Sequence, residues 1–144
     1  MEERPVYPAG IVFLVDRSTG VPAYRQIVNQ VLAALRLGRL VIGDRLPPVT
    51  EVVRQTSINV NTALKAYKTL EAQGITLAKQ GVGTLIVHNP FLGKETVHLE
   101  LVQRLDAVIA QAIRDGLTND DIRLTLATAL ERLTTTEEKT VAQQ

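Results

Sequence analysis

The sequence predicts a mainly α-helical protein with one small β-hairpin. Between residues 22 and 73, apolar residues recur at three- and four-residue steps, the period of helices that bury one face. After Gly74 the period changes to two on either side of Gly81 and Gly83, as in two strands joined by a tight turn. The helical period returns beyond residue 89. A composition of 45% apolar and 22% charged residues is typical of a globular chain.

Turn residues, prolines and glycines mark the boundaries of the first elements. Residues 11–15 form a short apolar run closed by residues 16–20, which predicts a strand or an extended arm ending in a turn. Pro22 suits the first turn of a helix, and its apolar stripe continues until Gly38. A rigid loop follows, and Pro48 suits the start of a second helix over residues 49–55.

A third helix is expected over residues 60–73, with Asn59 as its N-cap and Gly74 at its end. The strands of the hairpin are expected at residues 75–78 and 84–87, around a turn at 79–83. The inward stripe of the third helix is predicted to be Ala63, Leu64, Tyr67 and Leu70.

The chain after residue 89 predicts two amphipathic helices, the first ending near Gly116 and the second opened by a capping box of Thr118 and Asp121. Two such helices make little core of their own, so we expect their apolar faces to pack against a second copy of the chain. The polar stretch from Thr134 onwards is expected to fray. The residues expected at the dimer contact are Leu101, Leu105, Val108, Ile109, Ala112, Ile122, Leu126 and Leu130.

Three helices followed by a glycine-tipped hairpin is the order of a winged helix-turn-helix. The predicted organisation is an N-terminal arm or strand over residues 1–20, a winged helix-turn-helix DNA-binding domain over 21–88, a two-helix dimerisation segment over 89–136 and a flexible tail over 137–144. The charge agrees with this division: eight Lys or Arg oppose three acids in the winged part, whereas six oppose nine acids after it. A basic module favours contact with phosphate.

Several function classes find no support in the sequence. The chain has no cysteine, and its two histidines, His88 and His98, are accompanied by no paired carboxylates at a recognisable spacing, so we expect no catalytic residue, metal site or cofactor. The lone Gly-x-Gly lies between strands and lacks the helix that a nucleotide-binding motif needs. No apolar stretch approaches the roughly 20 residues of a membrane span, so a cytoplasmic protein with no membrane partner is expected.

A family resemblance rests on six motifs in this order: Tyr24-Arg25-Gln26-Ile27, Gly43-Asp44-Arg45-Leu46-Pro47, Asn61-Thr62, Lys65-Ala66-Tyr67, Leu70-Glu71-Ala72-Gln73-Gly74 and Gly81-Val82-Gly83-Thr84. They resemble the DNA-binding domain of the GntR family of bacterial transcription regulators, over about residues 11–88. The short tail and the leading segment resemble the YtrA-like branch. The resemblance implies a homodimer that binds an inverted repeat in a promoter and usually represses it.

The third helix is expected in the major groove, with Asn61 and Thr62 at base edges and phosphates. Many relatives carry basic residues at the positions of Thr50, Val60 and Leu64, so direct base readout is expected to be thin and binding to depend on charge. The residues expected to meet double-stranded DNA are Arg45, Thr50, Arg54, Asn59, Asn61, Thr62, Lys65, Lys68, Lys79, Gln80, Gly81, Gly83 and Thr84.

Some alternatives stay open at this point. Arg45 either contacts phosphate or only holds the loop before the second helix, and Tyr67 is expected to serve packing rather than base stacking. The missing basic residues also admit a winged-helix interaction or dimerisation module without sequence-specific DNA binding. A small-molecule effector is neither indicated nor excluded.

Overall fold

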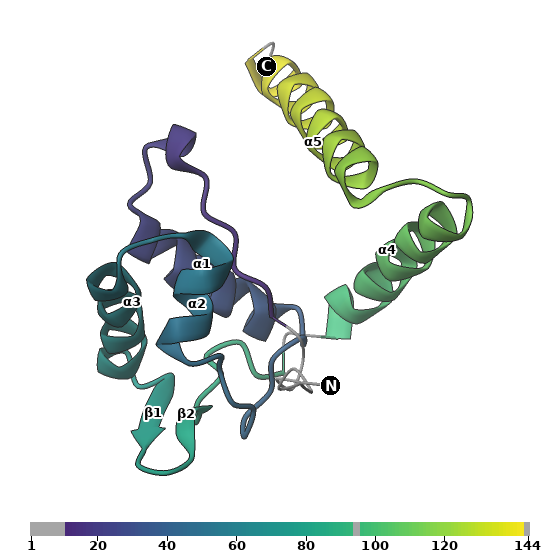
Figure 1. The fold of residues 1–144 in the computed structure, drawn as a ribbon. Coiled ribbons are helices and arrows are strands. Elements are labelled where there is room, and N and C mark those ends of the chain that lie inside the picture. The colour runs from purple at the N-terminus through teal and green to yellow at the C-terminus, as the bar shows by residue number, and fades with distance from the viewer. Residues whose placement is uncertain (1–10, 94–95, 143–144) are drawn as a thin grey trace. The chain divides into compact units, whose positions relative to one another are not determined.

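The computed structural model describes residues 11–93 and 96–142, and the chain forms two compact units, residues 1–99 and 100–144. The first ten residues of the predicted arm and the last two of the predicted tail lie outside the described residues. The mainly helical fold with a small hairpin is confirmed (Figure 1). The first unit contains α1 (Ala23–Arg36), α2 (Val49–Thr56), α3 (Val60–Ala72), β1 (Thr76–Lys79) and β2 (Gly83–Ile86).

The boundaries of α2 and α3 differ from the predicted ones by a residue, and their caps explain why. α2 continues through Thr56 and ends at Ser57, which takes the left-handed conformation at φ 57°. Asn59 caps α3 as predicted, because its side-chain oxygen accepts a hydrogen bond from the backbone N–H of Asn61 at 2.8 Å. Gln73, expected inside α3, is its C-cap instead.

The core of the first unit lies where α1 and α2 pack on α3. The stripe predicted for α3 is wrong at one position: Leu64 is 39% exposed, and Ala66 is buried in its place. The small side chains of Ala63 and Ala66 leave room for the neighbouring helices to approach closely. The buried apolar residues are Phe13, Ile27, Val28, Val31, Ala34, Leu35, Leu40, Leu46, Val52, Ile58, Ala63, Ala66, Tyr67, Leu70, Ile75 and Ile86.

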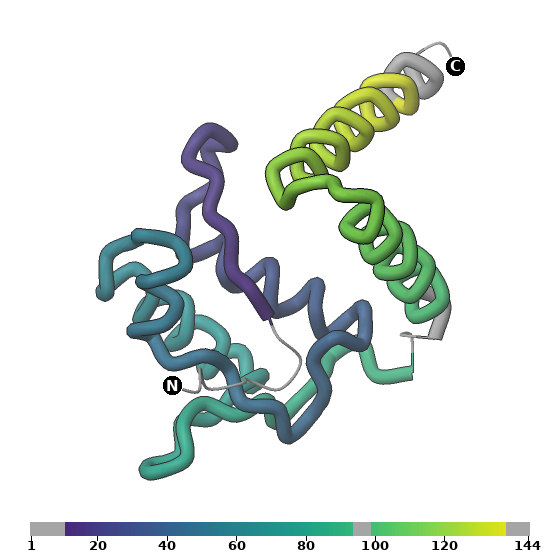
Figure 2. The backbone as a smooth tube through the Cα atoms, turned by 45° about the vertical axis from the view of Figure 1, so that its right-hand side comes forward, coloured from purple at the N-terminus to yellow at the C-terminus, as the bar shows by residue number. Residues whose placement is uncertain are grey.

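The described part of the N-terminal arm, from residue 11 onwards, is not a strand. Residues 11–16 have no regular secondary structure and lead through a 3-10 turn, Arg17–Thr19, into α1 (Figure 2). The side chain of Phe13 is fully buried in the core, whereas its neighbours Val12 and Leu14 are 61% and 58% exposed. The arm therefore contributes one aromatic anchor to the winged unit.

Glutamine side chains make the hydrogen bonds to the backbone of residues 13–16 that a neighbouring strand would make in a sheet. A carboxamide carries both an acceptor and two donors, so it can pair with a backbone N–H and a backbone carbonyl at once. Gln30 and Gln26 each do this, from successive turns of α1. The backbone N–H groups of Phe13, Leu14 and Asp16 donate to the side-chain oxygens of Gln55, Gln30 and Gln26 at 3.0, 3.0 and 2.8 Å, and the Leu14 and Asp16 carbonyls accept from Gln30 and Gln26 at 2.6 and 2.7 Å.

The hairpin is antiparallel, with Thr76 opposite Ile86 and Lys79 opposite Gly83, so its loop is shorter than predicted. The loop before α2 adds a third short segment beside β2. The backbone N–H of Leu46 donates to the Thr84 carbonyl at 2.9 Å, and that of Ile86 donates to the Asp44 carbonyl at 2.8 Å. The Gly-Asp-Arg-Leu-Pro segment is thus part of the wing as well as the entrance to α2.

The tail forms α4 (Thr96–Arg114) and α5 (Asn119–Ala142), separated by a turn at Gly116, which has φ 93°. The predicted capping box is confirmed: the Thr118 N–H donates to the Asp121 carboxylate at 2.8 Å, and the Asp121 N–H donates to the Thr118 hydroxyl at 3.1 Å. The segment from Thr134 that is expected to fray is helical as far as Ala142, where α5 ends, and its fraying stays a prediction.

Candidate nucleic-acid interface

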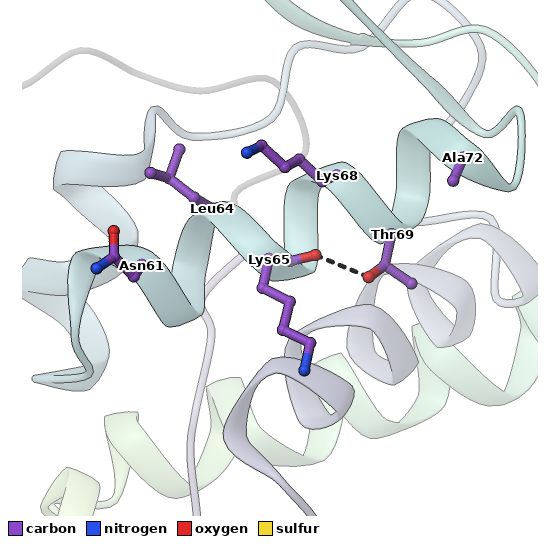
Figure 3. A pocket seen from close by; sticks show the side chains of 6 residues that line it. All are labelled: Asn61, Leu64, Lys65, Lys68, Thr69 and Ala72. Atoms are coloured by element: carbon purple, nitrogen blue, oxygen red, sulfur yellow. Dashed lines mark hydrogen bonds between the residues drawn. The ribbon is translucent and has the colours of Figure 1, made fainter.

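The outward face of α3 is a mixed polar and apolar surface. Asn61, Leu64 and Lys68 are exposed, and Val60 in the first turn is 46% exposed. Leu64 and Lys68 project to the same side of the helix, whereas Lys65 points to the other side (Figure 3). A hollow of about 450 Å³ runs along this face, lined by Asn61, Leu64, Lys65, Lys68, Thr69 and Ala72.

Lys65, predicted to meet DNA, contacts another helix of the same unit. Its ammonium lies 4.1 Å from the centre of the Tyr24 ring of α1, which is a cation–π contact. The guanidinium of Arg25 lies 5.2 Å from the centre of the same ring. One aromatic ring therefore holds two positive charges near the junction of α1 and α3. Lys65 itself is exposed, so its charge still faces solvent.

Arg54, the predicted basic contact of α2, forms a bidentate ion pair with Glu51 one turn earlier. Its Nε and Nη2 donate to the two carboxylate oxygens at 2.9 and 2.5 Å. The hydrogen bonds and the negative charge of Glu51 raise the pKa of Arg54 above its ordinary value. This pair reduces the net charge that α2 offers to phosphate. Thr50, in the first turn of α2, is exposed.

The side chain of Arg45 packs against the turn of the hairpin and hydrogen-bonds to it. Its Nη1 donates to the carbonyl of Val82 at 3.3 Å, and its Cδ lies 3.1 Å from the position that a Cβ would occupy on Gly83. Gly83 has φ 118°, a conformation that residues with a side chain rarely adopt. Arg45 was expected either to contact phosphate or to hold the loop before α2. Its contacts with Val82 and Gly83 favour a structural role, and they hold the tip of the wing as well as the loop.

The wing lies beside α3 and is tied to it. The Ala78 N–H donates to the carboxylate of Glu71, near the end of α3, at 3.3 Å. A hollow of about 200 Å³ separates the two elements, and Leu64, Lys68 and Thr84 are among its lining residues. The other predicted wing residues are exposed, namely Lys79, Gln80, Gly81 and Gly83, while Thr84 is half-buried.

The predicted DNA contacts thus fall into two groups. Asn61, Thr62 and Lys68 of α3 and its N-cap Asn59 lie on the same unit as the wing residues, with Thr62 half-buried and the Asn59 side chain capping the helix. Arg45, Arg54 and Lys65 have partners within the protein. The Glu51 partner could have been found from its three-residue spacing to Arg54. The Tyr24 ring could not, because it comes from a helix about 40 residues earlier in the chain.

Tyr67 serves packing, as predicted. It is 8% exposed, and its hydroxyl donates to the carbonyl of Pro47. In the tail, the predicted dimer residues Leu101, Leu105, Val108, Leu126 and Leu130 are 58%, 43%, 65%, 41% and 70% exposed, and Ile109, Ala112 and Ile122 are half-buried.

Within the described ranges 11–93 and 96–142, no helix is long and apolar enough to cross a membrane. The same ranges contain no group of three or more His, Cys, Asp or Glu residues placed to hold a metal ion.

Three helices, a capped and exposed third helix, and a hairpin hydrogen-bonded to it define a winged helix-turn-helix DNA-binding module. The sequence model described as "Bacterial regulatory proteins, gntR family" matches residues 23–86. The chain belongs to the GntR family and resembles its YtrA-like members. It is a DNA-binding transcription regulator of this type.

Two relatives from Bacillus subtilis (strain 168) illustrate the similarity. The uncharacterized HTH-type transcriptional regulator YhcF is 32% identical over 101 residues, which are 70% of this chain and 84% of that protein. The HTH-type transcriptional repressor YtrA is 39% identical over 75 residues, 52% of this chain and 58% of that protein. The second match is thus confined to about half of each chain.

Solved structures share the fold. A transcriptional antiterminator from Listeria monocytogenes EGD-e is 25% identical, with a TM-score of 0.50 over 81% of this chain and 87% of that one. YtrA from Sulfolobus acidocaldarius, a GntR-family transcription factor, is 23% identical, with a TM-score of 0.50 over 72% of this chain and 99% of that one.

Proposed function

We propose that the protein is a homodimer that binds an inverted repeat in promoter DNA and represses transcription from it. The observation that carries the proposal is the exposed face of α3 beside the wing, together with a tail that leaves large aliphatic side chains exposed. The name of the Bacillus subtilis relative, a transcriptional repressor, supports the sign of regulation.

The tail supports the dimer. Leu101, Leu105, Val108 and Ile109 recur at three- and four-residue steps, so they share one face of α4. Three of these four side chains are at least 43% exposed, an unfavourable arrangement for a lone chain in water. A second copy related by a two-fold axis covers the same face on both partners at once. Binding of such a dimer to an inverted repeat requires its two α3 helices to lie about 34–36 Å apart, one turn of DNA.

The basic residues support contact with the DNA backbone. Lys68 and Lys79 are exposed on α3 and at the end of β1. Counting only these two on each chain, a dimer neutralises about four phosphates. The logarithm of the binding constant is then expected to fall with the logarithm of salt concentration with a slope of about −3.6. Arg54 adds little to this slope because Glu51 already accepts its hydrogen bonds.

The test of operator binding uses the full chain, its own upstream promoter DNA and random DNA of equal length, over a salt series. Tight, promoter-selective binding is expected. Asn61→Ala should weaken promoter binding between about 5- and 150-fold, since a side-chain amide paired with adenine contributes about 1–3 kcal/mol. Asn29→Ala, an exposed asparagine of α1, is the matched control. Equal weak binding to both DNAs would contradict the proposal and favour an interaction module.

The dimer is tested separately by light scattering during gel filtration. Leu105→Asp places a charge on the predicted contact face and should shift the protein towards a monomer, with loss of promoter binding. Leu124→Asp is the control, because Leu124 is 70% exposed and lies outside the predicted set. A Leu105→Asp protein that stays dimeric would show that the tail face is not the interface.

A further inference from the structure

We propose that α3 selects thymine in each half-site, and that Val60 and Leu64 read its C5-methyl group in the major groove. This inference rests on the proposed function, because it requires that α3 enters the groove. It assigns a role to two apolar residues at positions where the sequence led us to expect a loss of base readout.

The geometry places both side chains on the same side of the helix. Val60 and Leu64 are four residues apart, about one helical turn, and they are 46% and 39% exposed. The inward positions of α3 are filled by other residues, Ala63, Ala66, Tyr67 and Leu70, all of which are buried. The two aliphatic side chains are therefore not needed for the core of the described unit.

Leu64 also occupies a central place on this surface. It lines the hollow along α3 and, together with Thr84 of β2, the hollow between α3 and the wing. Lys68 lines both hollows too, and Asn61 lines the first. Figure 3 shows the side chains of Leu64 and Lys68 on the same side of the helix. An aliphatic side chain flanked by the amide of Asn61 and the ammonium of Lys68 suits a partner that carries negative charge and also exposes small apolar groups.

The major groove of DNA is such a partner. Thymine exposes a methyl group there, next to the N6 and N7 atoms of its paired adenine. An amide pairs with that adenine edge, and an aliphatic side chain contacts the methyl. Asn61 and Leu64 lie three residues apart and can supply both contacts at A·T pairs. Arginine and lysine side chains select guanine, but α3 contains no arginine and its Lys65 lies over the Tyr24 ring. The helix is therefore less suited to guanine than to an A·T pair.

The experiment begins with the full-length protein and a random pool of duplex DNA, from which bound sequences are selected and read. Each thymine of the enriched half-site is then replaced, one at a time, by deoxyuridine, which keeps base pairing and removes only the methyl. We expect at least one position where this replacement weakens binding about fourfold, the factor that burying one methylene-sized group is worth.

Protein variants assign the effect to its residue. In Leu64→Ala or Val60→Ala, binding to the thymine site should weaken, and the same deoxyuridine replacement should make no further difference. Val12→Ala is the control, since Val12 is 61% exposed on the arm and lines a hollow beside α1 instead. It should keep the full methyl effect. Both α3 variants change exposed side chains to a good helix former, so their folding should be unaffected, which thermal unfolding checks.

Three results would overturn the inference. The enriched half-site could contain no thymine, the wild-type protein could bind deoxyuridine and thymine equally, or the methyl effect could persist in both α3 variants. A selection that enriches no sequence would overturn the proposed function, and the inference with it. That result is distinguishable from an enriched half-site that is indifferent to the methyl.

Discussion

Phe13 should be among the most important residues for the stability of the winged unit, although it lies outside its regular elements. Its side chain is fully buried, and a phenylalanine buries about 150–250 Å². At about 25 cal/mol per Å² this corresponds to roughly 4–6 kcal/mol as an upper value, and measured Phe→Ala losses in cores are about 3–5 kcal/mol. We therefore expect Phe13→Ala to lower the free energy of unfolding by about 3–5 kcal/mol, a large share of the stability of a small domain.

The neighbours of Phe13 provide matched controls in the same arm. Val12→Ala and Leu14→Ala remove side chains that are 61% and 58% exposed, and each should cost less than about 0.5 kcal/mol. Urea unfolding followed by circular dichroism measures all three variants at one fixed protein concentration, because dimer formation makes stability concentration-dependent. If Phe13→Ala unfolds at the same urea concentration as Val12→Ala, the arm is not part of the folded unit and the reasoning fails.

Three further perturbations follow from the structure. Tyr67→Phe removes the hydroxyl that donates to the Pro47 carbonyl and should destabilise the unit by about 1–2 kcal/mol in urea. Gly83→Ala forces a side chain into φ 118°, at a cost of about 1–3 kcal/mol, and should weaken promoter binding in the titration described above. Hydrogen bonds from Thr118 lower the pKa of Asp121. The stabilisation that the ionised carboxylate gives to α5 is therefore complete above the pKa of an ordinary aspartate and is lost as the pH falls through the lowered pKa. The loss of helicity during an acid titration measures it.

Each of these has an outcome that would count against it. A Tyr67→Phe protein as stable as wild type would mean that water replaces the lost donor. Undiminished promoter binding by Gly83→Ala would remove the wing tip from the interface. For the capping box, Asp121→Asn should remove the acid-induced change in helicity, and an unchanged titration curve in that variant would assign the change to other carboxylates.

Local patterns were sufficient for most of the fold. Helical spacing, the Asn59 cap, the Thr118 capping box and the glycine-tipped hairpin each depend on residues within a few positions of one another, and all four are present in the structure. The arm was less predictable, because an apolar run predicts extended backbone without saying what pairs with it. Its partners are glutamines up to 42 residues away, and an isolated glutamine has no periodicity to reveal such a role.

The candidate site was harder to predict than the fold. Charge counting identified Arg54 and Lys65 as basic, but whether a basic side chain faces DNA or another part of the protein depends on tertiary neighbours. Lys65 meets Tyr24 of α1, and Arg54 meets Glu51 of its own helix. The exposure of Leu64 was also missed, because Ala66, a small residue that the apolar pattern did not single out, fills the inward position predicted for Leu64.

The hydrogen bonds that join the wing, the loop before α2 and α3 have a thermodynamic consequence for binding. Tyr67 ties α3 to that loop, Leu46 ties the loop to β2, and Glu71 ties α3 to the hairpin. Elements fixed in this way before association have little conformational freedom left to lose when they meet a ligand. The wing and α3 should therefore dock as one preorganised body, so that sequence differences between DNA sites change the dissociation rate much more than the association rate.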